Sequence, residues 1–154
     1  MTQSSPMTQS SPNPSDERIV DTMIQLARVA KLHRMIVAGA NSAEILVELH
    51  RRGYLRVTTT KICREPCRQF DVALVVWREH SIKALENTLD RLAHYLGAAG
   101  VLVLWIGPHE RIANQMLGLV VQRLGFRIES GTRCENGIAI AARRLDSVPA
   151  AKTA

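Results

Sequence analysis

Apolar residues recur along this chain with two spacings, one typical of helices and one typical of buried strands. Ile19, Met23 and Ala27 follow one another at helical spacing, on a predicted helix that Ser15 would cap. Predominantly apolar runs, typical of strands covered on both faces, stand at MIVAGA, FDVALVVW and GVLVLWIG. The pattern therefore predicts strands that helices cover on both sides.

Helices and strands alternate through the rest of the chain. Further helices are predicted at residues 42–52 and 81–96 and after Pro108, and further strands at residues 55–60, 126–132 and 137–144. Gly53 and Gly97 are expected helix ends, and the Asn136-Gly137 pair predicts a hairpin. We therefore expect an α/β fold, a three-layer Rossmann-like sandwich with a mostly parallel sheet of about six strands and a C-terminal antiparallel hairpin.

The two ends of the chain differ in composition from the middle. The opening MTQSSPMTQSSPNPS repeats a polar hexapeptide, which cannot bury enough apolar surface to offset its ordering entropy. We expect a disordered tail over residues 1–14, one Rossmann-like domain over residues 15–145 and a flexible tail over residues 146–154. A chain of 154 residues is long enough to bury a core without covalent staples.

Length and cysteine content also bear on location and metals. No apolar run approaches the roughly 18 residues of a membrane span, and three cysteines argue against a secreted disulfide framework. We therefore expect a cytoplasmic protein without a membrane partner. Cys63 and Cys67 have a spacing that zinc could use, but a structural zinc site needs a second pair. Two ordinary thiols are favoured, and no metal is expected.

The formal net charge of +6 permits an anionic partner such as a nucleic acid. Six cations fall within eighteen residues and face one acid, Glu65: they are Arg51, Arg52, Arg56, Lys61, Arg64 and Arg68. If they converge, they could bind phosphates. The alternative is a solvated basic face, and an aromatic content of 4% gives little for base stacking.

Four stretches follow one another in an order that suggests a family. VAGANSAEIL has a small-residue turn after the first strand, and FDVALVV places Asp71 at the start of a later strand. LDRLAHYLGAAGVLVLWI and RLGFRIESGTRCENGIAIAARR then supply a helix, a strand and the closing hairpin. Together they resemble the class I S-adenosylmethionine-dependent methyltransferases, over roughly Ser15 to Arg144. The hairpin argues against the alternatives, an NAD-type or a flavodoxin-like domain.

The resemblance implies S-adenosylmethionine as cofactor, held by Gly39, Asn41, Thr59 and Asp71. The chain departs from the family pattern at several of these places. Asn41 and Ala43 stand where the family has its later glycines, and Val37 replaces an acid two residues before the first. Thr58, Thr59, Thr60 and Lys61 occupy the end of the second strand, where the family has a ribose-binding acid. A helix–strand–helix unit is reduced to KICREPCRQ.

Candidate catalytic residues follow the strand FDVALVVW, because open α/β sheets bind ligands beyond the carboxyl ends of their strands. Glu79 or His80 could serve as a general base, and Trp77 could stack on a planar substrate. The structural alternative is that Ser81 caps the next helix and its neighbours are ordinary polar residues.

Two functional hypotheses follow. The first is a truncated, degenerate methyltransferase-like domain that acts as a binding or regulatory module. Its shortened unit would leave the second strand at an edge, where a homodimer could form. The second is an active S-adenosylmethionine-dependent methyltransferase, with an anionic substrate such as nucleic acid as one option.

Overall fold

The computed structural model describes residues 14–63, 68–78, 81–107, 124–134 and 137–144. The helices are α1 (Pro14–Ala27), α2 (Ser42–Arg51) and α3 (Ile82–Tyr95). The strands are β1 (Met35–Gly39), β2 (Val57–Thr59), β3 (Phe70–Trp77), β4 (Leu96–Ile106), β5 (Phe126–Cys134) and β6 (Gly137–Arg144). The helix expected after Pro108 and the turn residue Asn136 lie outside the described residues, as do residues 1–13 of the expected N-terminal tail and all of the expected C-terminal tail, residues 146–154.

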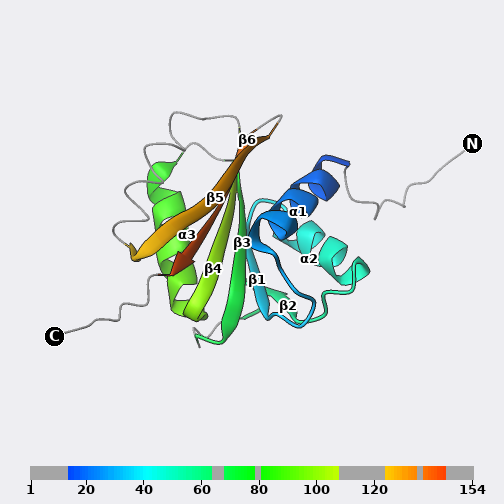
Figure 1. Cartoon of the computed structure of the whole chain (residues 1–154), viewed down its shortest axis with the longest axis horizontal. Helices are drawn as coiled ribbons and strands as arrows, with labels where there is room; N and C mark the ends of the chain where they lie inside the picture. Colours follow the sequence, from blue (N-terminus) through cyan, green and yellow to red (C-terminus); the bar gives the residue numbers. More distant parts are fainter. Residues whose placement is uncertain (1–13, 64–67, 79–80, 108–123, 135–136, 145–154) are drawn as a thin grey trace, which may run out of the picture.

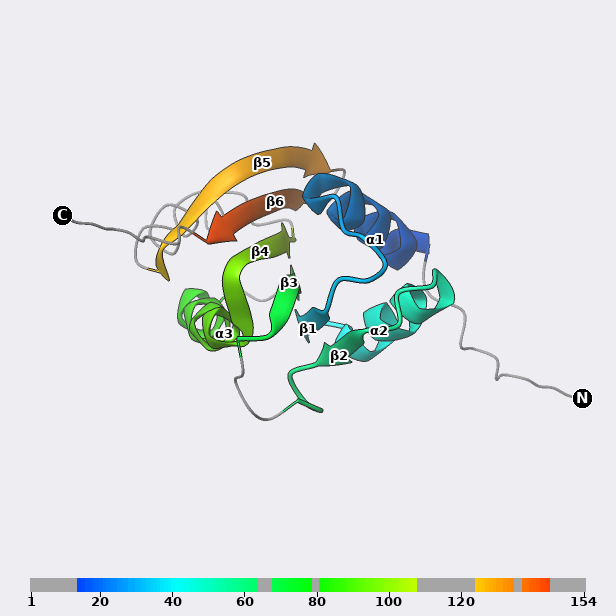
Figure 2. The same ribbon diagram turned by 60° about the horizontal axis from the view of Figure 1, so that its bottom comes forward.

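The strands form a six-stranded sheet in the order β2-β1-β3-β4-β6-β5 (Figure 1). β2, β1, β3 and β4 are parallel, and β6 runs antiparallel to both β4 and β5. Helices α1 and α2 lie on one side of the sheet and α3 on the other, as Figure 2 shows. The α/β sandwich predicted from the hydrophobic pattern, with its mostly parallel sheet and closing hairpin, is confirmed.

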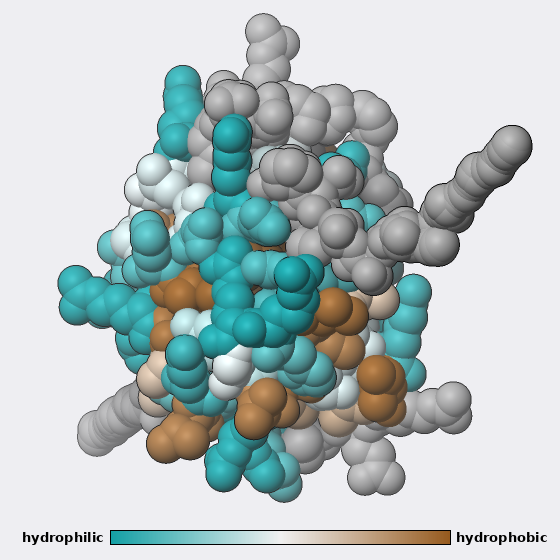
Figure 3. Space-filling model, turned by 90° about the vertical axis from the view of Figure 1, so that its right-hand side faces the viewer, coloured by the Kyte–Doolittle hydropathy of each residue, from teal (hydrophilic) through white to brown (hydrophobic). Residues whose placement is uncertain are grey.

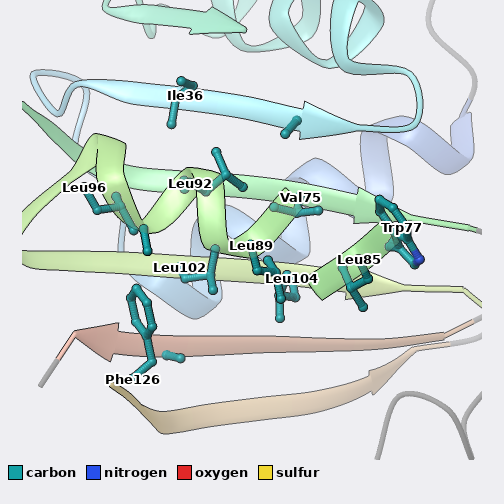
Figure 4. Close-up of a cluster of buried hydrophobic side chains, with 14 of the residues drawn as sticks. Ile36, Val75, Trp77, Leu85, Leu89, Leu92, Leu96, Leu102, Leu104 and Phe126 are labelled. Atoms are coloured by element: carbon teal, nitrogen blue, oxygen red, sulfur yellow. The ribbon is translucent and has the colours of Figure 1, made fainter. Parts of the chain in front are cut away.

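Alternate residues of the central strands feed two separate cores. In β3, Ala73, Val75 and Trp77 face α3, whereas Val72, Leu74 and Val76 face α1 and α2. Leu85, Leu89 and Leu92 of α3 project onto the first of these sets (Figure 4). Because successive side chains of a strand point to opposite faces, an uninterrupted apolar run is what a strand covered on both sides requires.

Several boundaries differ from those expected. β2 has only three residues, because the carbonyl of Thr59 accepts the N–H groups of Ile62 and Cys63 and the chain turns there. α1 already includes Pro14 and Ser15, so the backbone of Ser15 lies within the helix and not before it. α3 ends at Tyr95 and passes directly into β4, which contains Gly97 in an irregular stretch of the ladder.

An ion-pair network joins the two helices on the same face. Arg52, just after α2, pairs with Glu48 of α2 at 2.6 Å and with Asp21 of α1. Burial lowers the pKa of Arg52, but its hydrogen bonds with Glu48 and Asp21 outweigh this, so the pKa is raised overall. Arg52 therefore stays charged and fixes α1 against α2.

Replacing Arg52 with alanine should lower the free energy of unfolding by about 1–3 kcal/mol, because the Glu48 carboxylate would lose its partner. The Glu48 side chain is only 9% exposed, so water cannot fully replace the guanidinium. Urea denaturation at neutral pH measures the change. The matched control is Arg51→Ala, an exposed neighbour at the same helix end, with an expected change within about 0.5 kcal/mol. Equal losses in the two variants would contradict this account.

Candidate functional site

The carboxyl ends of the four parallel strands meet at one edge of the sheet and are tied together by backbone hydrogen bonds. Ala40 N–H donates to the Val76 carbonyl at 2.8 Å, and Gly107 N–H donates to the Trp77 carbonyl at 2.8 Å. Thr60 N–H donates to the Val37 carbonyl at 3.2 Å. In open α/β sheets this edge is where ligands bind, so the candidate site is built here.

Gly39, at the end of β1, is required by its neighbouring strand. Its φ of +93° lies in the left-handed region that favours glycine. A Cβ at this position would overlap the backbone carbonyl of Val76 in β3. The glycine is therefore explained by the packing of β1 on β3, and its presence is not by itself a sign of a ligand.

Asn41 forms the left-handed turn that leads into α2. Its φ and ψ are 56° and 31°, as expected of a residue that tolerates this conformation, and its side chain makes no capping hydrogen bond. Ala43, in the first turn of α2, is exposed. The turn has thus formed with asparagine and alanine in place of glycines, and the first N–H groups of α2 point toward the carboxyl edge.

The ends of β1 and β2 carry no carboxylate at the positions where the methyltransferase family has its acids. Val37 is fully buried and packs in the core beneath α2. Thr59 is 4% exposed, and Thr58 and Thr60 are half-buried. A ribose could reach the Thr59 hydroxyl only if the surrounding side chains moved. These strand ends therefore lack the carboxylate that the resemblance places against the ribose of S-adenosylmethionine.

Trp77, at the end of β3, belongs to the core. It is 6% exposed and packs in the cluster beneath α3, so stacking on a substrate would require the ring to leave that core. Glu79 and His80 lie outside the described residues. The Ser81 hydroxyl accepts a hydrogen bond from Ala84 N–H at 3.1 Å, which confirms its capping role. The packing of Trp77 and the Ser81 cap agree with the structural alternative given for this stretch.

Arg78 is a cation at this edge that the sequence did not single out. Its guanidinium lies 5.3 Å from the centre of the Trp105 ring of β4, within the range of a cation–π contact. Trp105 is 5% exposed and faces α1 and α2. Nothing in the sequence pairs an arginine after one strand with a tryptophan inside another; the parallel register of β3 and β4 does so.

Asp71 lies at the opposite edge of the sheet. It stands five residues before Val76, the partner of Gly39, and is therefore roughly 16 Å of strand away from the turn. Its carboxylate accepts the Arg34 N–H at 2.8 Å. It also lines a cavity of about 620 Å³ whose wall includes His33, Glu129 and Arg143. The structure does not bring Asp71 to the turn at Gly39 and Asn41, because Asp71 lies near the beginning of β3 and not at its end.

Five of the six cations of the basic stretch are described, and they are divided between the two edges. Arg52 is committed to Glu48 and Asp21, and Lys61 follows β2 at the carboxyl edge. Arg51 and Arg56 lie at the amino edge, where Arg68 precedes β3, and Arg64 lies outside the described residues. Arg28, Lys31 and Arg34, from the loop after α1, join them at the amino edge. A sequence run alone could not show this, because the crossover brings the two loops together.

The described ranges contain no cluster of three or more histidine, cysteine, aspartate or glutamate side chains suited to a metal ion. Cys63 is half-buried and its carbonyl accepts the Tyr95 hydroxyl, whereas Cys67 lies outside those ranges. None of the helices in the described part of the chain is long and apolar enough to cross a membrane.

Solved structures of other proteins share this arrangement, although no protein-family model and no curated protein matches the sequence. Geranyl diphosphate C-methyltransferase from Streptomyces coelicolor A3(2) aligns with a TM-score of 0.61 and 9% identity, over 84% of this chain and 80% of that one. Ribosomal protein L11 methylase from Lactobacillus delbrueckii subsp. bulgaricus aligns with a TM-score of 0.61 and 13% identity, over 86% of this chain and 80% of that one. The cyclase SpnF aligns with a TM-score of 0.62 and 10% identity, over 83% of this chain and 80% of that one.

This chain has the class I methyltransferase fold. The expected resemblance is confirmed at the level of architecture. The three solved structures are only 9–13% identical to this chain, and one of them is described as a cyclase. The reaction must therefore be argued from the residues at the carboxyl edge of this chain.

Replacing Gly39 with alanine should lower the free energy of unfolding by about 2–5 kcal/mol, since the new Cβ meets the β3 backbone in a left-handed conformation. Gly125→Ala is the matched control: its φ is +80°, but among the described residues beyond its chain neighbours no heavy atom lies within 4 Å of the added Cβ. That variant should lose only about 1–2 kcal/mol. Urea denaturation without any ligand measures both. Equal effects would contradict a packing role for Gly39.

Proposed function

We propose that this methyltransferase-fold domain is a binding or regulatory module that does not use S-adenosylmethionine in the ordinary way. The observation that carries the proposal is the pair of strand ends at β1 and β2. Val37 and Thr59, which are 0% and 4% exposed, stand where the family resemblance calls for carboxylates. Neither side chain can offer a solvent-facing pair of acceptor oxygens to a ribose.

The free energies involved support weak or absent binding of S-adenosylmethionine. A hydroxyl buried without its partner costs about 1–3 kcal/mol, and micromolar affinity needs about 8 kcal/mol in total. Losing the acceptors for two ribose hydroxyls could therefore remove much of the binding free energy. Gly39 does not offset the loss, because its packing against β3 accounts for it. The domain keeps the fold while its cofactor contacts are reduced.

Titration calorimetry of the purified chain with S-adenosylmethionine, and with its demethylated product, tests the proposal. We expect no heat of binding and no thermal shift at millimolar ligand. A ligand present at about 100 times its dissociation constant would stabilise the fold by about 2.7 kcal/mol, which is several degrees for a domain of this size. A saturable heat at micromolar ligand, with a matching thermal shift, would overturn the proposal.

One observation favours an active S-adenosylmethionine-dependent methyltransferase as a second candidate. Asn41 adopts the left-handed turn, and the N-terminus of α2 that follows carries no side-chain cap. Its N–H groups remain available at the edge where the methionine part of the cofactor would lie. Arg78 would then be at hand for an anionic substrate such as nucleic acid.

Ala43→Phe separates the two candidates without touching the core. Ala43 is exposed in the first turn of α2, so a phenyl group there should occupy the ligand space while stability changes by no more than about 0.5 kcal/mol. Val47→Phe, one turn further along α2 and 49% exposed, is the matched control. For an active methyltransferase, only Ala43→Phe should abolish cofactor binding. Unchanged binding in both variants would exclude the α2 turn as the cofactor site.

Self-association through β2 is part of the same proposal, because β2 forms one edge of the described sheet. The edge is short, and the carbonyl of Thr59 is already used by the turn that follows. A homodimer formed here would therefore rely on side chains more than on strand pairing.

A further inference from the structure

Two exposed leucines lie at the amino edge of the sheet, at the end opposite the turn at Gly39 and Asn41. Leu32 lies in the loop between α1 and β1 and is 76% exposed, and Leu55 lies between α2 and β2 and is 73% exposed. They are the most exposed large apolar side chains in the described part of the chain. We call residues 28–34 and 53–56 the leucine loops.

The fold holds the leucine loops side by side. Met35 N–H donates to the Arg56 carbonyl at 2.8 Å, which aligns the entrances of β1 and β2. The Lys31 ammonium lies 5.9 Å from the centre of the Tyr54 ring, so the first loop reaches over the second. The two leucines are therefore presented at the same end of the molecule, each two or fewer residues from a cation.

The leucine loops are strongly basic. They contain the cations Arg28, Lys31, Arg34 and Arg56 and no aspartate or glutamate. All four cations are exposed. Arg51 and Arg68 lie at the same edge, and the carboxylate of Asp71 is held by the Arg34 N–H. Figure 3 shows brown hydrophobic areas among teal hydrophilic side chains on the face that carries α1 and α2.

The side chains at hand favour a lipid surface over a nucleic acid. All six aromatic residues of the chain are described, and none is exposed: five are less than 9% exposed and Phe70 is half-buried. No exposed aromatic ring is therefore there to stack on a base. In a complex made through phosphates alone, the two leucines would bury no apolar surface. Two leucines are also too little apolar surface for the centre of a protein interface, which usually covers about 800 Å² per partner.

We propose that the leucine loops dock the domain on an anionic lipid surface. Leu32 and Leu55 enter the boundary between headgroups and acyl chains, while the four cations meet the headgroup phosphates. The expectation of no membrane partner rested on the lack of a spanning run, and surface docking needs no span. The proposal stands whether or not S-adenosylmethionine binds, because the carboxyl edge then faces away from the lipid.

Co-sedimentation of the full chain with vesicles tests this docking. Vesicles of phosphatidylcholine with phosphatidylglycerol should bind the chain, and vesicles of phosphatidylcholine alone should not. The double variant Leu32→Ser, Leu55→Ser should weaken binding by about tenfold or more, because the inserted apolar surface is lost. Ile62→Ser is the matched control: Ile62 is 67% exposed but lies beyond the carboxyl end of β2, so vesicle binding should be unchanged.

Variants that remove a positive charge test the contribution of the cations to vesicle binding independently. Lys31→Gln and Arg56→Gln should each weaken binding by about fivefold, whereas Lys61→Gln, at the opposite edge, should have little effect. Thermal melts establish that every variant is folded.

Three outcomes would overturn the proposal. The first is an equal loss for Ile62→Ser and for the leucine double variant. The second is an absence of binding to anionic vesicles. The third is binding to duplex DNA with a steep salt dependence, together with vesicle binding that does not respond to the leucines; this would identify nucleic acid as the partner.

Discussion

Burial of the central strands on both faces is the constraint on which the rest of this structure depends. β3 can lie between β1 and β4 only if its odd and even side chains are both apolar, because each set packs against a different layer of helices. With side chains filling both faces, only the strand ends are left for polar groups. For these central strands, polar chemistry is therefore confined to the two edges, about one strand length apart.

The hydrophobic pattern was enough to predict most of this architecture. Continuous apolar runs predicted β1, β3 and β4, and Ser81 marked the start of α3 because a hydroxyl there satisfies a helix N–H. The length of β2 could not be predicted, since the residues LRVTTT all favour a strand. The chain leaves the sheet early because two N–H groups converge on the Thr59 carbonyl, which is a property of the folded turn.

The candidate site was harder to predict, because a motif does not say which end of a strand a residue occupies or what surrounds it. Gly39 and Asn41 do lie in the turn between β1 and α2, since a strand followed by a helix fixes the turn between them. Asp71 was assigned to the same site although it begins its strand. Arg78 was missed because its partner Trp105 comes from a strand more than twenty residues later. Contacts between neighbouring parallel strands come from the three-dimensional register, not from the local sequence.

The short β2 edge has a consequence for aggregation. Removing outer strands from a sheet normally exposes a row of N–H and C=O groups on which further chains can pair. Here the β2 edge is three residues long and its last carbonyl is already engaged, so it offers little template for growth. The turn at Thr59 thus limits the pairing surface at this edge of the sheet. A sequence change that extended β2 past this turn would expose a longer edge and promote cross-β assembly.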